Sequence, residues 1–307
     1  MTYTTGSVID DADYNAFAVD TDAVWGTGAD ESGYGQTNTV GYVTQGFTVT
    51  ATQWATLLTR IASAASHSGT SISTITNPTA GSTISAYAAL STNVDAIRNN
   101  NAAASGADTT VSTTTTTAWT ATATTTKTIT FASADQLRYF FNAGGMIRMG
   151  FSRSGGTASD QNTSWTNLLT QAGTIVLTGA GDPGPQKTIA GTLYYGTTRI
   201  GGTGTPTVLA EGIGVYNLTG SNQELYKQFA TTYTYTSNYT KIDASISGAV
   251  ITITVSLADV SGPGVPGGLD SIDGTLTMDT TLRAPSTTYI ADTWGTPTQN
   301  SATWTLT

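Results

Sequence analysis

The chain has 307 residues, enough to bury a core without disulfide bonds, and its lack of cysteine excludes thiol catalysis, cysteine metal sites and redox switching. Only 10% of the residues are charged, and no stretch approaches the roughly 20 apolar residues of a membrane span, so we expect no membrane insertion. The net charge is -9, and all seven charged residues before Arg60 are acidic. We therefore expect no nucleic acid partner for this part of the chain; the acidic residues form either solvated helix faces or a docking surface for a basic partner.

The start of the chain differs from a secretion signal. Residues 1–13 are polar and acidic, with no Lys or Arg and no apolar run. The many threonines, by contrast, are typical of strand surfaces that endure outside a cell. Together these features predict a protein that is assembled in the cytoplasm and released by a route other than secretion, such as a virion component.

Three segments in the first hundred residues have apolar side chains at helical spacing. The first follows an N-cap at Asp10 or Asp11, the second follows a sequence of capping-box form at residues 50–53, and the third begins at about Ser82. Their apolar stripes comprise Tyr14, Phe17, Ala18, Thr21, Val24 and Trp25; Trp54, Leu57, Leu58, Ile61, Ala62 and Ala65; and Ile84, Tyr87, Leu90, Val94 and Ile97. We expect these helices to pack on one another or on a neighbouring subunit.

Two glycine-rich or small-residue stretches interrupt this helical part. Four glycines within residues 26–36 exclude regular structure there, and residues 99–101, all asparagine, end the third helix. The stretch through Ser105 and Gly106 marks the domain boundary. We therefore expect an acidic helical docking module over residues 1–105 and a β-rich domain over residues 106–307.

Beyond this boundary the apolar period changes from that of a helix to that of a strand. Over residues 118–131 the even positions hold Ala118 and then threonines, while apolar residues occupy odd positions, which predicts a half-buried strand with a threonine face in water. Lys127 breaks the apolar face and predicts a bulge or an edge position. Residues 113–117 either extend this strand or form a linker.

The remaining pattern is mainly that of strands. Short helices are expected at residues 133–143, where Gly144 stops the helix, and at residues 161–171, with a strand at 147–151 between them. Further strands are expected at 174–177, 188–195, 229–235, 241–247, 250–257 and 274–282, with a tight hairpin at Ser247 and Gly248. The predicted fold class is α+β, mainly β: a small N-terminal helical module followed by a β-rich, sandwich-like domain with one or two short helices.

Two regions resemble virion structural proteins of tailed bacteriophages. The first combines residues 13–15, 25–28, 33–36 and 52–54, which read DYN, WGTG, GYGQ and TQW. The second contains residues 133–148, 152–156 and 162–169, which read SADQLRYFFNAGGMIR, SRSGG and NTSWTNLL. The resemblance covers about residues 1–70 and 118–175. It implies a non-enzymatic building block of the particle, of the kind described as a tail, fibre or generic virion structural protein.

Catalytic and cofactor sites find little support in the sequence. His67 is the sole histidine and lies at a helix end, so a structural role is favoured over a metal or catalytic one. Residues 179–184 match the glycine pattern of a dinucleotide site, but Pro183 and Pro185 exclude the helix that would hold the pyrophosphate, which predicts a turn.

Carboxylates and tyrosines are the other candidate functional residues. Glycan hydrolysis needs two facing carboxylates, and the spacing of the glutamates and of the aspartates in turns reveals no such pair. The same residues show no spaced loop of oxygen ligands for calcium. These residues are Glu31, Glu211, Glu224, Asp270 and Asp273. Four tyrosines could stack on a sugar, although ordinary strand faces or subunit contacts are favoured. They are Tyr226, Tyr233, Tyr235 and Tyr239.

The sequence therefore predicts no catalytic, cofactor-binding or metal-binding residues. We expect a virion protein, tail- or neck-associated and fibre-like, whose partners are copies of itself and other phage virion proteins. A trimer is favoured by analogy with phage fibres, and a host surface glycan is a further candidate partner. A capsid decoration protein, a glycan-binding or glycan-degrading tailspike and a surface adhesin are the alternatives.

Overall fold

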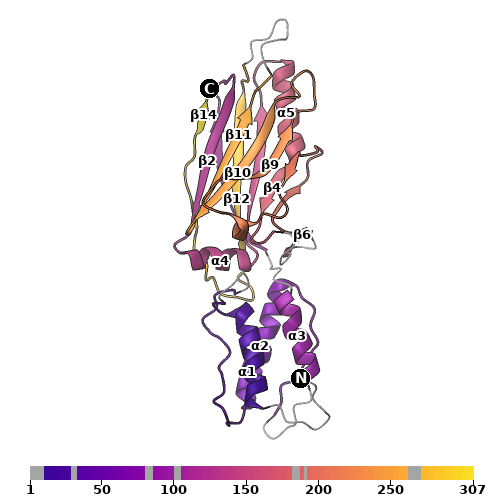
Figure 1. Ribbon diagram of the computed structural model, residues 1–307, viewed down its shortest axis with the longest axis vertical. Coiled ribbons are helices and arrows are strands. Elements are labelled where there is room, and N and C mark those ends of the chain that lie inside the picture. The colour runs from indigo at the N-terminus through magenta and orange to yellow at the C-terminus, as the bar shows by residue number, and fades with distance from the viewer. Residues whose placement is uncertain are drawn as a thin grey trace.

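The computed structural model describes residues 10–28, 33–79, 86–99, 105–181, 187–189, 192–261 and 271–307. Three N-terminal helices occupy one end of an elongated molecule, and two antiparallel sheets form most of the rest (Figure 1). The predicted class, α+β and mainly β, is confirmed. Within the ranges just given, no helix has the length and apolar character needed to cross a membrane.

The N-terminal helices are α1 (Asp11–Trp25), α2 (Ala51–Ser68) and α3 (Tyr87–Asn99). Asp10 caps α1 and Thr50 caps α2, each in a reciprocal capping box. The box at Thr50 confirms the prediction, and of the two N-cap candidates for α1 the structure uses Asp10. The predicted stripe of α1 is buried throughout. In α2, however, Ala62 is exposed and Ala64 is buried in its place, so that part of the stripe was wrong. Ser82 and Ile84 lie outside the described residues.

The chain between α1 and α2 returns alongside α1. The Trp25 indole donates to the Asn38 carbonyl at 3.2 Å, and Asn15 exchanges two hydrogen bonds of 2.8 Å with the backbone of Val43. Because later residues of this segment meet earlier residues of α1, it runs antiparallel to that helix. It therefore brings the start of α2 back beside the start of α1, where the Tyr14 hydroxyl donates to the Gln53 carbonyl.

Two sheets share one core. The five-stranded sheet has the order β1 (Ser105–Thr115), β12 (Thr275–Pro285), β3 (Met146–Ser154), β4 (Thr174–Leu177) and β7 (Thr197–Ile200). The seven-stranded sheet has the order β13 (Thr298–Gln299), β2 (Thr122–Thr130), β11 (Val250–Ala258), β10 (Tyr239–Ser247), β9 (Gln223–Phe229) and β8 (Val208–Leu209), and β14 (Trp304–Leu306) also pairs with β2. Strands β5 (Lys187–Ile189) and β6 (Thr192–Tyr194) form a separate pair, and a 3-10 turn, η1, spans Val215–Asn217.

Strand β2 buries its odd-numbered residues, as predicted, but the bulge expected at Lys127 is absent. The register between β2 and β11 is unbroken from Thr122 opposite Ala258 to Thr130 opposite Val250. Nor is β2 an edge strand, because β13 and β14 pair with its other side. Lys127 is only 1% exposed, and its Nζ donates to the Asn300 carbonyl at 2.6 Å, in the interval between β13 and β14. Burial lowers the pKa of this amine.

Other strand predictions were wrong in part. Residues 113–115 belong to β1 of the opposite sheet and do not extend β2. Residues 230–235 are not a strand, since β9 ends at Phe229 and Tyr233 has a φ of 57°, which is incompatible with an extended chain. The strand expected at 188–195 is divided between β5 and β6. The hairpin at Gly248 is confirmed, with a φ of 57° at that glycine.

The two other helices close the ends and sides of the sheets. Helix α5 (Asp160–Ala172) packs on β3 of one sheet and on β9 and β10 of the other, with Trp165, Leu168 and Leu169 buried as predicted. Helix α4 (Ala134–Asn142) lies between the sheets and the N-terminal helices (Figure 1). It is capped by Ser133, and Gly144 follows it with a φ of 96°.

Helix α4 joins the helical part to the β-rich part. Asn142, fully buried, donates to the Gly33 carbonyl at 2.8 Å, and Gln36 exchanges hydrogen bonds of 3.0 and 2.9 Å with the backbone of Ala291. Gly35 approaches the Tyr139 ring so closely that an added Cβ would lie 2.4 Å from it. The two parts are therefore held by direct contacts at α4 and at Ala291 as well as by the chain that links them.

Candidate functional surfaces

No catalytic or metal centre emerges where the structure describes the chain. No three His, Asp or Glu residues of that part are grouped so that they could hold a metal ion. His67 is buried at the end of α2, where its Nε2 lies 2.9 Å from the Ala143 carbonyl and its ring packs 5.1 Å from that of Tyr34. These contacts give His67 a structural role at the junction with α4.

Among the candidate carboxylates, Glu224 faces a carboxylate of the neighbouring strand, with a lysine beside the pair. Glu211 is exposed in a turn after β8, and Glu224 lies on β9 opposite Asp243 of β10. The Asp243 carboxylate pairs with Lys241 at 2.7 Å, and this hydrogen bond raises the pKa of the amine. Both carboxylates therefore interact with the Lys241 amine. Glu31 and Asp270 lie outside the described residues.

The glycines of the dinucleotide-like pattern serve the packing of chain segments. The Gly179 carbonyl accepts from Tyr216 at 2.9 Å, and the Gly181 amide donates to the Asn217 side chain at 3.1 Å. An added Cβ at Gly181 would lie 2.2 Å from the Gly212 carbonyl oxygen. These glycines therefore allow the chain to lie close to the turn at η1; residues 182–184 are outside the described part.

The four tyrosines do not form a stacked row. Tyr226 is buried, which raises its pKa to about 12, and Tyr235 is also buried. The Tyr239 ring packs against Phe229 and lies 4.3 Å from the Lys227 amine. Of the four, Tyr233 alone is exposed, at the turn beyond β9.

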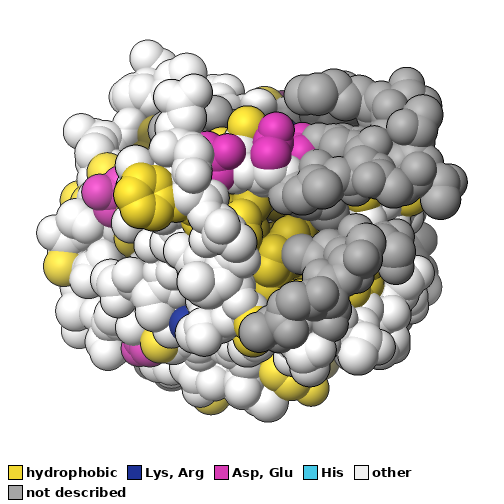
Figure 2. All heavy atoms as spheres, turned by 90° about the horizontal axis from the view of Figure 1, so that it is seen from below, with side chains coloured by type: hydrophobic (Ala, Val, Ile, Leu, Met, Phe, Trp, Pro, Cys, Tyr) yellow, Lys and Arg dark blue, Asp and Glu magenta, His cyan; other side chains and the backbone are white. Residues whose placement is uncertain are grey.

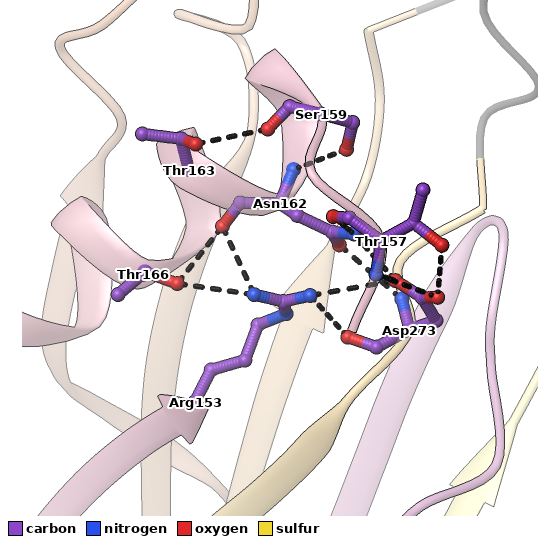
Figure 3. A network of polar contacts seen from close by, with 7 residues as sticks. All are labelled: Arg153, Thr157, Ser159, Asn162, Thr163, Thr166 and Asp273. Carbon is purple, nitrogen blue, oxygen red and sulfur yellow. Dashed lines mark hydrogen bonds and ion pairs between the residues drawn. The ribbon is translucent and has the colours of Figure 1, made fainter. Parts of the chain in front are cut away.

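A polar network that the sequence did not reveal ties the loop after β3 to the start of α5 and to Asp273, just before β12 (Figure 3). The Asp273 carboxylate accepts from the Thr157 amide at 3.0 Å, the Thr157 hydroxyl at 2.7 Å and the Asn162 side chain at 2.5 Å. These hydrogen bonds, with a smaller contribution from Arg153, lower the pKa of Asp273.

Arg153 completes this network from the end of β3. Its guanidinium donates to the Thr166 hydroxyl at 3.1 Å, to the Asn162 carbonyl at 3.3 Å and to the Asp273 carbonyl, and it lies 3.5 Å from the Asp273 carboxylate. Because these polar groups are engaged with one another, the network fixes the start of α5 to the start of β12. It is a structural tie with little capacity left for a ligand.

At the helical end, the acidic residues of α1 are also engaged within the chain. Asp10 and Asp13 cap the helix reciprocally, and Asp11 accepts from the Gly46 amide at 3.1 Å. Asp20 pairs with Arg98 at 3.0 Å, and Asp22 accepts from the Val40 amide at 2.9 Å. The acidic bias is therefore largely explained by capping and by the return segment, without a basic partner.

The exposure of several apolar side chains at the helical end is not explained by contacts within the described part of the chain. Phe47 is 68% exposed, Tyr42 is 60% exposed and Val19 is 53% exposed. Figure 2 views the molecule from this end and shows hydrophobic side chains in and around a hollow, with acidic side chains beside them. A contiguous exposed apolar patch is typical of interaction surfaces.

Comparison with protein-family models, with curated proteins and with solved structures gave no match.

Proposed function

We propose that the protein is a non-enzymatic structural component of a tailed-phage virion, associated with the tail or neck and fibre-like. It acts by assembly with copies of itself and with other virion proteins. The resemblance of residues 1–70 and 118–175 to virion structural proteins supports this function. The division into a helical end and a long β-rich part is consistent with one end that docks and another that projects.

The exposed apolar side chains at the helical end carry the docking proposal. Burying a large aromatic side chain against a partner contributes favourably to binding, whereas leaving it in water gives the isolated protein no benefit. We therefore assign docking to the helical end, where Val19, Tyr42 and Phe47 are exposed, within the proposed module of residues 1–105. The acidic side chains of α1 are engaged internally and contribute little to this assignment.

Self-association through unpaired sheet edges is a weaker argument than the sequence indicated. The long edge strand β1 is covered, since Gln299 donates to the Thr109 carbonyl at 3.2 Å and Trp304 to the Thr113 carbonyl at 3.1 Å. At the opposite edges, β7 has four residues and β8 has two. Short strands are poor templates for pairing. A homo-oligomer, including the trimer favoured by analogy, would thus use side-chain faces.

The docking proposal is tested with Tyr42→Ser combined with Phe47→Ser. We expect this variant to remain folded and to be depleted from assembled particles, as measured by quantitative mass spectrometry of purified virions. Tyr289→Ser, at a site 47% exposed in the β-rich part, is the matched control and should be incorporated normally. Incorporation of the double variant at the wild-type level would show that this surface does not dock. Cryo-EM of the same particles would locate the protein and give its symmetry.

A further inference from the structure

The outer face of the five-stranded sheet carries a groove of about 310 Å³. A row of residues in register crosses all five strands at this point. It comprises Ser112 of β1, Asp279 of β12, Gly150 of β3, Thr174 of β4 and Ile200 of β7. The central position of the row has no side chain, and the groove passes over it.

Gly150 is not required by the fold. Its backbone does not have a positive φ, and an added Cβ would meet only the Thr174 hydroxyl oxygen, at an ordinary distance of 3.8 Å. Gly106 in β1 is different, because a Cβ there would lie 2.4 Å from the Pro285 carbonyl oxygen. Glycine inside a strand weakens a sheet, and it often marks a place where a ligand or another backbone approaches closely. The space above Gly150 is therefore suited to a ligand or to another polypeptide.

The groove is lined by groups that both donate and accept hydrogen bonds. Arg148 lies 3.8 Å from Asp108 on one side, and Asp279 accepts from the Ser112 hydroxyl at 2.5 Å on the other. Hydroxyls fill the spaces between them: those of Thr110 and Thr281 are 2.8 Å apart, and that of Thr174 lies beyond Gly150.

The charges and hydrogen-bonding groups of the lining determine which class of small ligand fits the groove. Two carboxylates, Asp108 and Asp279, and one guanidinium, Arg148, line the groove, and Arg283, which lies 3.5 Å from Asp108, offsets the second carboxylate from beside the groove. Phosphates and other anions would face two carboxylates. Apolar ligands would meet little besides Ile200 and threonine methyl groups. A neutral polyol, whose hydroxyls donate to carboxylates and accept from a guanidinium, matches the lining well.

We propose that this groove binds a short, uncharged saccharide over Gly150, with Asp279, Arg148 and the threonine hydroxyls as its hydrogen-bonding partners. The volume is at the lower end of the range for small-molecule sites, about 300–1,000 Å³. In a virion such a site would serve recognition of a surface glycan, but the binding belongs to the β-rich part and can be measured on the purified chain whether or not the docking proposal holds.

Gly150→Val is the main test. Valine favours strands and has room for its Cβ, so the variant should fold with an unchanged or higher Tm while its side chain fills the floor of the groove. Methyl glycosides of glucose, galactose, mannose and N-acetylglucosamine serve as probes in saturation-transfer NMR. We expect at least one to bind the wild-type protein and none to bind Gly150→Val. Ser152→Val, on the same strand and exposed outside the groove, should bind as the wild type does.

Two further variants keep the test decisive if valine disturbs the sheet. Asp279→Asn replaces a charged acceptor by a neutral amide and Thr281→Val removes a hydroxyl, both with the shape preserved, and the loss of the carboxylate charge should weaken binding about tenfold or more. Failure of every glycoside to bind the wild type overturns the proposal, as does undiminished binding by a folded Gly150→Val. A change in oligomeric mass of Gly150→Val by light scattering, without saccharide binding by the wild type, would assign the groove to a second polypeptide instead.

Discussion

The two ends of the molecule satisfy their acidic side chains in different ways. At the helical end, Asp10 and Asp13 accept from backbone amides three residues away, and Asp22 accepts from Val40, 18 residues away. At the far end, Asp273 binds Thr157 and Asn162, which are 116 and 111 residues distant. The acidic side chains at the helical end thus find their partners within the first hundred residues, while Asp273 at the far end joins segments more than a hundred residues apart.

The largest effect is expected from Trp165→Ala in α5. This side chain is buried between the sheets, with its ring 4.8 Å from that of Trp119, and its removal leaves a cavity that the surrounding strands cannot fill. The free energy of unfolding should fall by about 3–5 kcal/mol, measured from urea transitions. Tyr289→Ala, at an exposed site, should change it by no more than about 0.5 kcal/mol. Equal effects for the two variants would contradict the assignment of α5 to the core.

A second substitution, Asn142→Leu, tests the junction between the two parts. It removes the donor to the Gly33 carbonyl and the acceptor of the Tyr216 hydroxyl, which lies 2.5 Å from Asn142. Losing buried partners should cost about 1–3 kcal/mol, and hydrogen exchange should accelerate in α1 and α2. Tyr216→Phe keeps the bond to Gly33 and should leave exchange in these helices unchanged. Unaltered exchange in Asn142→Leu would mean that the Asn142 side chain does not stabilise the helical end.

The sequence predicts features that depend on nearby residues better than features that depend on residues far apart in the chain. The caps at Asp10 and Thr50 are encoded within four residues, and both helices were predicted with their N-termini in place. Strand β1 was missed because its repeated threonines show no apolar alternation, and its partner β12 lies more than a hundred residues away. The Arg153–Asp273 tie and the row through Gly150 depend on sheet order, for which single residues carry no signal.

Removing a helix cap should have a smaller and more local effect. Thr50→Ala deletes the acceptor of the Gln53 amide and should cost about 1 kcal/mol. Faster hydrogen exchange should be confined to the first turns of α2. Ser133→Ala removes the equivalent cap of α4, and because α4 contacts both parts, exchange should accelerate on both sides of it. Faster exchange in the sheets of Thr50→Ala would contradict the local character of this cap.

The smallest effect on stability is expected at low pH. Asp273 has a folded pKa below its ordinary value of 3.8, so its contribution to stability is fully present above that pH and is lost as the pH falls through the folded pKa. The wild-type protein should therefore lose stability more steeply in this acid range than Asp273→Asn does. Urea midpoints taken at several pH values below 4 provide the measurement. Parallel curves for the two proteins would show that the network does not depend on the carboxylate charge.

The covering of β1 by the C-terminal segment has a consequence for biosynthesis. Strand β1 leaves the ribosome well before its backbone partner β12 and the side chains of Gln299 and Trp304, since β1 ends at Thr115 and β12 begins only at Thr275. During that interval its backbone groups are open to pairing with other nascent chains. Val111 is the only large apolar residue of β1, and the rest are small or polar. Segments of this kind are less prone to aggregate than apolar strands, so the threonine-rich composition suits a strand that must wait for its partner.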